Sequence, residues 1–245
     1  MTHHASHTSG TGYPVQLDLP GQTHVADGPH DQSGMYVMHH GFRRDLARFE
    51  RAVRNTPVGD AATWRALAKR WAAFTEVLHH HHTIEDEHIW PLVIERAEER
   101  GDAEDVETLE AMEAEHDTID PALAACAEGF AAMVEHPCAD HRNALDVRVT
   151  DLRAGLLDHL QHEETGALPL IQQLLSAEEF AGTERAAGKG YPPRAMPFLI
   201  PWLLDGLPDD AAARFVASKP AVLRTLPPLL RPRYQRGEAK AFGYA

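Results

Sequence analysis

Four stretches of the chain repeat apolar residues at alternating steps of three and four, which is the spacing of one face of an α-helix. These stretches cover about residues 33–55, 61–100, 102–135 and 140–175. The segments between them are short, and short connections join helices that run in opposite directions. The pattern therefore predicts an all-α protein, an antiparallel up-down-up-down four-helix bundle around one core.

Capping residues and prolines mark the expected ends of these helices. Asp60 is a favourable N-cap before the second stretch. Pro57 and Pro137 follow the first and third stretches and cannot continue a helix. Pro91 lies inside the second stretch, where we expect a kink or the end of a first segment, and Pro121 predicts a kink in the third.

The two ends of the chain differ in composition from the bundle, which we place at residues 31–176. Residues 1–30 contain glycines, prolines and histidines, and we expect a flexible leader there. Residues 177–245 are rich in proline, which predicts a C-terminal appendage of short helices. We expect this appendage to pack against the bundle or a neighbouring subunit; the alternatives are a lid, a partner surface or a segment that touches a membrane.

Charge and cysteine content narrow the class of protein. The formal net charge of −14 argues against nucleic-acid binding. The two cysteines, Cys126 and Cys138, suggest neither a disulfide framework nor a thiolate metal site. No segment reads as a signal peptide, and no apolar run has the length of a membrane span. We therefore expect a cytoplasmic protein without a membrane partner.

Six ionisable residues interrupt the apolar stripes. They are His39, His81, Glu85, His116, His159 and Glu163. Carboxylates rarely lie in a core unless they are paired or bind a metal. The segments HHTIEDEHIWP, which begins at His81, and HLQHEETGALP, which begins at His159, share one spacing: a Glu four residues after the His, and a Pro six residues after that Glu. Together with the single histidines, this predicts two helical hairpins of the same design.

The spacing also predicts the chemistry of the site. Residues four apart lie on one helical face, so each His-x3-Glu pair can reach the same metal centre. Four imidazoles and two carboxylates are too many for one tetrahedral ion, and they suit two ions bridged by the glutamates. This donor set favours iron, with manganese and zinc as competitors. The alternative is a metal-free network of buried salt bridges and hydrogen bonds.

Further residues near the stripes are candidates for supporting roles. Carboxylates can hydrogen-bond to the outer nitrogens of ligand histidines, and otherwise they belong to a solvated face; the candidates are Asp86, Glu115 and Glu164. His88 is the best candidate for an extra ligand, and His40 is the alternative to its neighbour His39. His79, His80 and His82 flank the stripe, and we expect them at the surface or behind the ligands.

The ordered pattern His, His-x3-Glu, His, His-x3-Glu resembles the hemerythrin-like HHE cation-binding family. The stretches MHHGFRRDL, HHTIEDEHIWP, EAEHDTID and HEETGALPL are similar to its four helix motifs, over about residues 33–175, and the tail is similar to an appendage of some actinobacterial members. The resemblance implies a bundle that holds two non-haem iron ions, oxo- or hydroxo-bridged. Met112 stands where oxygen carriers have a fifth histidine, and His-x3-Glu replaces their His-x4-Asp, which argues against reversible oxygen carriage.

We accordingly expect a non-haem di-iron protein that binds or reacts with a small oxidant (oxygen, hydrogen peroxide or nitric oxide) in oxidative or nitrosative stress. Catalase-like or peroxidase-like activity is compatible with this pattern, with no catalytic residue separate from the metal ligands. The first alternative is an iron-sensing or redox-sensing module without catalysis. The second is a structural helical interaction protein. The expected small-molecule partner is a diatomic or peroxide, and the pattern identifies no protein partner.

Overall fold

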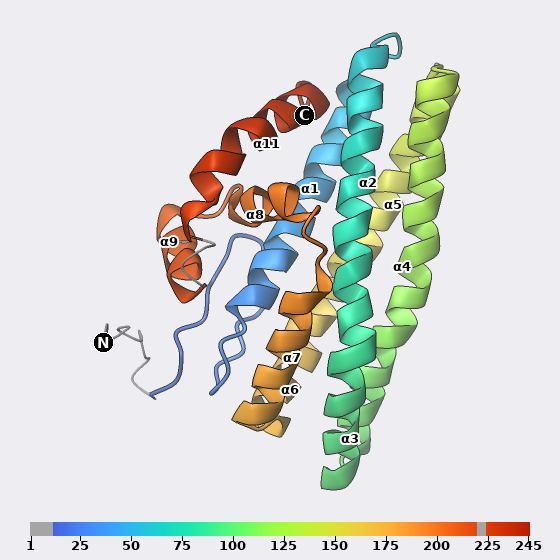
Figure 1. Cartoon of the computed structure of the whole chain (residues 1–245). Coiled ribbons are helices and arrows are strands. Elements are labelled where there is room, and N and C mark those ends of the chain that lie inside the picture. Colours follow the sequence, from blue (N-terminus) through green and yellow to red (C-terminus); the bar gives the residue numbers. More distant parts are fainter. Residues whose placement is uncertain (1–11, 220–223) are drawn as a thin grey trace.

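The computed structural model of the chain describes residues 12–219 and 224–245. Over these residues the fold is all-α and contains no β-strand, which confirms the predicted all-α class. Long helices lie side by side and form a bundle (Figure 1). They are α1 (Ser33–Asn55), α2 (Ala61–Ile84) continued by α3 (Trp90–Arg100), α4 (Ala103–Glu135), and α5 (Ala139–His162) continued by α6 (Leu168–Leu174).

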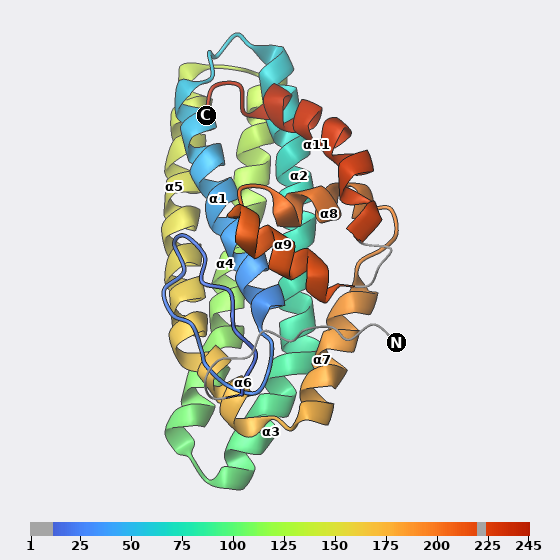
Figure 2. The same cartoon turned by 90° about the vertical axis from the view of Figure 1, so that its left-hand side faces the viewer.

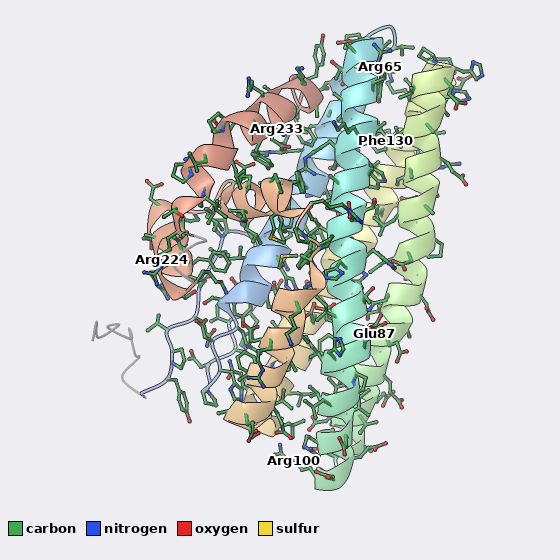
Figure 3. The ribbon with its side chains drawn as sticks, viewed as in Figure 1. Arg65, Glu87, Arg100, Phe130, Arg224 and Arg233 are labelled. Carbon is green, nitrogen blue, oxygen red and sulfur yellow. The ribbon has the colours of Figure 1, made fainter. Side chains whose placement is uncertain are left out.

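Apolar residues at the predicted helical spacing meet in the core. Phe49 of α1 packs edge to face against Trp71 and Phe74 of α2 and against Phe130 of α4, with ring centroids between 4.9 and 5.8 Å apart. Phe130 is labelled on α4 in Figure 3. All four rings are almost fully buried. Burying a side chain of this size stabilises the fold by roughly 1.5–3 kcal/mol relative to its exposure.

Local signals fix the helix ends. The Asp60 carboxylate accepts a hydrogen bond from the Thr63 backbone N–H at 3.1 Å, so Asp60 is the N-cap that the sequence predicted. Gly101 ends α3 with a φ of 78°, in the left-handed region where a side chain would be strained. Asp102 then caps α4, which runs without interruption through Pro121.

The interruption expected near Pro91 takes the form of a π-helical turn, η1 (Glu85–Ile89). A second π-helical turn, η2 (Glu163–Ala167), precedes Pro169 at the equivalent place in the other hairpin. A proline ring clashes with the carbonyl four residues earlier and offers no N–H, and a wider turn relieves both problems. Both segments therefore continue past their proline, and each π-helical turn begins at a glutamate of a His-x3-Glu pair.

Residues 12–32 pack against the bundle as an extended segment, which differs from the flexible leader we expected. Leu17, Leu19 and Ala26 are almost fully buried. The Gln172 side chain of α6 accepts a hydrogen bond from the His30 backbone N–H and donates to backbone carbonyls of this segment. Residues 1–11, which carry the rest of that prediction, lie outside the described residues.

The C-terminal part forms short helices that cover one side of the bundle, which faces the viewer in Figure 2. They include α7 (Ala177–Gly190), α8 (Met196–Leu204), α9 (Asp209–Ser218) and α11 (Pro227–Ala241). α8 packs against α1, α11 packs against α2, and α7 packs against α2 and η1. We call this part the appendage.

A buried ion network joins the appendage to the bundle. Asp45 of α1 is fully buried and accepts hydrogen bonds from Trp202 Nε1 of α8 at 2.7 Å and from Arg44 Nε at 3.0 Å. Arg70 of α2 pairs with the same carboxylate, and its Nε donates to Glu238 of α11 at 2.6 Å. Charged groups of α1, α2 and α11, together with the Trp202 indole N–H of α8, thus satisfy one another at this interface.

Gly41 allows α8 to approach α1 closely, so Gly41→Ala is expected to weaken the docking of the appendage. A Cβ at this position would lie 2.6 Å from two atoms of the Trp202 indole. Relief of that overlap is expected to lower the free energy of unfolding by about 1–3 kcal/mol in a denaturant titration. Gly155→Ala is the control, because nothing lies within 4 Å of its added Cβ, and it should stabilise α5 by about 0.5–1 kcal/mol. Equal effects of the two variants would contradict this account.

Candidate metal centre

The structure brings the six predicted ligand residues together in the interior. His39 comes from α1, His81 from α2, His116 from α4 and His159 from α5, while Glu85 and Glu163 begin η1 and η2. All six are buried, with side chains no more than 7% exposed. Their helices pack around a single core, so residues distant in sequence converge on one place.

The donor atoms form two groups. One contains His39, His81 and Glu163, and the other contains His82, His116 and His159. Within each group, one donor atom per residue lies within 4.8 Å of the others. Two adjacent groups of this kind suit two cations, in keeping with the number that the sequence predicted.

The two glutamates lie between the groups. Glu85 Oε1 is 3.0 Å from His81 Nε2, and Glu85 Oε2 is 3.7 Å from His116 Nε2 in the other group. Glu163 Oε2 is 3.1 Å from His39 Nε2 and 3.9 Å from His159 Nε2. Each carboxylate therefore faces histidines of both groups, which is the arrangement needed for a bridging ligand.

Three carboxylates support the histidines from behind. Asp86 Oδ1 is 2.8 Å from His116 Nδ1, Glu115 Oε2 is 2.8 Å from His159 Nδ1, and Glu164 Oε1 is 2.9 Å from His39 Nδ1. A carboxylate accepts from an N–H, so it holds the proton on Nδ1 and leaves the lone pair of Nε2 facing the centre.

Other groups hold two of these carboxylates in place. Glu164 accepts from the Arg43 guanidinium at 2.6 Å and from the Thr23 backbone N–H at 2.7 Å. Glu115 lies 2.8 Å from His162 Nδ1 as well. The orientation of the inner histidines thus depends on a network that extends to the N-terminal segment.

The side-chain nitrogen and oxygen atoms that face the centre lack hydrogen-bond donors as partners. His116 Nε2 and His159 Nε2 face each other at 3.2 Å, although both Nδ1 protons are committed to carboxylates. Both oxygens of Glu85, Glu163 Oε1 and both ring nitrogens of His82 are buried and make no hydrogen bond with any described residue. Buried polar atoms without partners are costly, and a cation between converging lone pairs removes that cost. The residues present therefore fit metal ions.

Burial and neighbouring charges shift the pKa values of the glutamates and histidines at the centre of the metal-free protein. Burial, with repulsion from Glu163 and Asp86, raises the pKa of Glu85 well above its ordinary value. Burial and the neighbouring histidines lower the pKa values of His81 and His82 well below 6.5, which keeps both imidazoles neutral. Burial opposes ionisation of His39, but the charges of Glu163 and Glu164 outweigh it and raise the pKa to about 9. Neutral imidazoles such as those of His81 and His82 bind metals, and a metal ion would displace the second proton of His39 and take its place beside the carboxylates.

His82 lies in a donor group although the apolar stripe of its helix did not indicate it. Its ring stacks on that of His116, with centroids 3.9 Å apart and planes 9° from parallel, and it is almost fully buried. The other hairpin has Leu160 at the matching position, so the two halves differ here. The run of four histidines from His79 was the available signal, but it did not distinguish His82 from its neighbours.

Two predicted extra ligands lie outside both groups. His88 is exposed, because a π-helical turn has more residues per turn than an α-helix and His88 no longer returns to the face of Glu85. His40 is buried, but its Nε2 lies near Gly206 of the appendage. Met112, at the position of the carriers' fifth histidine, is a fully buried core residue.

No helix among residues 12–219 and 224–245 combines the length and the apolar character required to cross a bilayer.

Comparison with curated proteins found no match, and comparison with solved structures found none either. The sequence model of the hemerythrin HHE cation binding domain matches residues 31–171, which is more than half of the chain and includes every residue of both donor groups. The chain therefore belongs to the hemerythrin HHE cation-binding domain family.

Proposed function

We propose that the protein is a non-haem di-iron protein that binds or reacts with a small oxidant: oxygen, hydrogen peroxide or nitric oxide. The observation that carries this proposal is the pair of buried donor groups, together with two glutamates, Glu85 and Glu163, that each face histidines of both groups. Family membership supports cation binding within residues 31–171, the range that contains these donors. The proposed role is in oxidative or nitrosative stress. For the fold, we propose that the four long helices run up-down-up-down.

The donor set favours iron. Imidazole and carboxylate ligands on a site with open coordination positions are typical of iron, and manganese and zinc are the competitors. We assign His39 and His81 to one ion and His82, His116 and His159 to the other, with Glu85 and Glu163 as bridges. Seven residues for two ions would leave room for a small molecule to bind.

The side chains of the protein would bind the metal ions, orient the ligand histidines and shield the centre from water. When bound, ferrous ions would supply the electrons and the open positions that a diatomic or a peroxide requires. Asp86, Glu115 and Glu164 fix the tautomers of the inner histidines. No separate acid or base is assigned, because the residues of both donor groups and the two glutamates are proposed ligands, and the carboxylates behind them are partners of ligands.

The test is the iron content of the full chain together with its near-ultraviolet spectrum. His3, His4 and His7 should be replaced by alanine so that the first residues do not add to the count. Two irons per chain and the absorption of a bridged ferric pair, both lost in Glu163→Ala, would support the proposal. A folded protein that takes up no iron, or that retains a single zinc, would overturn it.

His82→Ala is expected to remove one of the two ions. His82 belongs to the second donor group, which contains no carboxylate, and its loss leaves that group with two of its three donors. We expect the iron content to fall from two toward one per chain, as measured by elemental analysis after desalting. His79→Ala is the matched control, because the His79 side chain is 69% exposed and lies in neither group. Two tightly held irons in His82→Ala would remove His82 from the ligand set.

Iron or redox sensing is a second candidate, favoured by the contact between α7 and η1. Glu85, a proposed bridge, begins η1, so filling of the site can change the surface on which the appendage rests. Limited proteolysis with and without iron tests this idea. Identical cleavage of residues 177–245 in both states would count against sensing.

A further inference from the structure

A cavity of about 290 Å³ lies between the bundle and the appendage. Its walls come from α1 (Met35, Met38), α8 (Leu199, Leu203), α9 (Phe215) and α7 (Phe180), and they are mostly apolar. Apolar cavities of about 150 Å³ stay dry and bind benzene, so this volume suits a molecule of about a dozen non-hydrogen atoms. Ligand sites of this kind combine an apolar wall with few polar groups.

One end of the cavity adjoins the candidate metal centre. His81 and Glu85, which belong to that centre, are part of the wall. Tyr191, at the C-terminal end of α7, lines the same cavity, and its ring centroid is 4.2 Å from that of His80. The Tyr191 hydroxyl makes no hydrogen bond with any described residue, and burial together with the charge of Glu85 raises its pKa. A protonated hydroxyl without a partner is therefore available to a ligand near the metal centre.

The charges in the wall select against an anionic ligand. Among the described residues, the ionisable groups that line the cavity besides His81 and Tyr191 are two carboxyls, Glu85 and Glu184, and one amine, Lys219. The Lys219 ammonium is already engaged with the Phe215 ring, 4.6 Å from its centroid. A fatty-acid anion would compete with the Glu184 carboxyl for the single ammonium of Lys219, whereas a neutral oxygen can accept a hydrogen bond from Tyr191.

We propose that this cavity binds a neutral, largely hydrocarbon molecule with one oxygen-containing end group, with that end toward Tyr191 and Glu85. The site is distinct from the positions of the metal ions and far larger than a diatomic or a peroxide requires. It gives the appendage a function, because residues 177–245 supply more than half of the lining residues. The inference concerns binding, and it adjoins the proposed function without depending on iron.

Gly34 provides a way to close the cavity without disturbing the fold. It lies in the first turn of α1, lines the cavity, and has nothing within 4 Å of an added Cβ. Gly34→Phe would place a ring in this open space, while Gly34→Ala adds one carbon and serves as the matched control. Tyr191→Phe removes only the hydroxyl and provides an independent variant of normal shape.

The experiment is a calorimetric titration of 1-octanol into the full chain, with and without iron, with octanoate as the anionic comparison. We expect saturable binding of 1-octanol in both states and binding of octanoate at least tenfold weaker. Gly34→Phe should weaken 1-octanol binding at least tenfold and Tyr191→Phe several-fold, and Gly34→Ala should leave it within twofold.

Several results would overturn the proposal. They are the absence of saturable 1-octanol binding, equal affinity of the wild type and Gly34→Phe, or preference for octanoate. The failure of the proposed function is a separate result, because a protein that binds 1-octanol but no iron retains the cavity site and loses the di-iron role. A protein that binds two irons but no 1-octanol loses only the cavity site.

Discussion

Asp45→Ala is expected to lower the free energy of unfolding by about 3–5 kcal/mol, because removal of one partner leaves buried charges without compensation. The Asp45 side chain has no exposed surface, and its partners Arg70 and Arg44 are 6% and 10% exposed. The indole N–H of Trp202 also loses its acceptor. The loss can be measured by urea unfolding at neutral pH, and limited proteolysis should show the appendage cleaved first.

Two comparisons separate this network from ordinary surface pairing. Asp146→Ala breaks an ion pair with Arg54, whose side chain is 46% exposed, and should cost less than about 1 kcal/mol. The double variant Asp45→Leu with Arg70→Met should cost less than the sum of its single changes, because an apolar pair replaces two charges. A loss below about 1 kcal/mol in Asp45→Ala would contradict the account.

The same carboxylate predicts the pH dependence of stability. Burial opposes ionisation of Asp45, but the charges of Arg70 and Arg44 outweigh it and hold its pKa below the ordinary 3.8. The folded state therefore binds this proton less readily than the unfolded chain, and its stabilisation is present above pH 3.8 and is lost as the pH falls through the lower folded pKa. The difference in stability between the wild type and Asp45→Ala should shrink over that acidic range.

The second large effect concerns the difference in stability between the wild type and a variant that lacks a buried glutamate. We expect this difference to change sign when the metal ions are removed. Replacing Glu85 with leucine should stabilise the metal-free protein, because a buried carboxyl whose two oxygens make no hydrogen bond leaves the core. With iron present, the wild type should instead be the more stable, since a ligand at a thousand times its dissociation constant adds about 4 kcal/mol per site. Thermal unfolding of both proteins, with ferrous iron and with a chelator, measures the four stabilities.

The pattern of the four stabilities discriminates between the functional alternatives. A crossover, with the variant more stable without iron and the wild type more stable with it, supports a cation site at Glu85. A variant that is more stable in both states would favour a purely structural helical protein. Glu87→Leu is a suitable control, because Glu87 lies on η1 but is exposed, and it should respond to iron as the wild type does.

Local sequence was enough to place the bundle helices and most of the candidate centre. The apolar spacing gave α1 over Ser33–Asn55, and Asp60 marked the start of α2, because helical periodicity and capping are properties of neighbouring residues. The His-x3-Glu spacing placed each pair on one face, and the repeat of that spacing indicated that the two pairs meet. Their assignment as metal ligands stays a prediction that the metal analyses test.

Tertiary structure decided what depends on the rotation and contact of distant segments. Whether His82 or His88 turns inward depends on how α2 and η1 sit against α4, and the periodicity of one helix does not specify this. The packing of residues 12–32, the ion network between Asp45 and Trp202, and the cavity beside Tyr191 join parts of the chain that are far apart in sequence. The physical reason is that helix formation follows from local hydrogen bonds and spacing, whereas these features arise only when separate surfaces come together and exclude water.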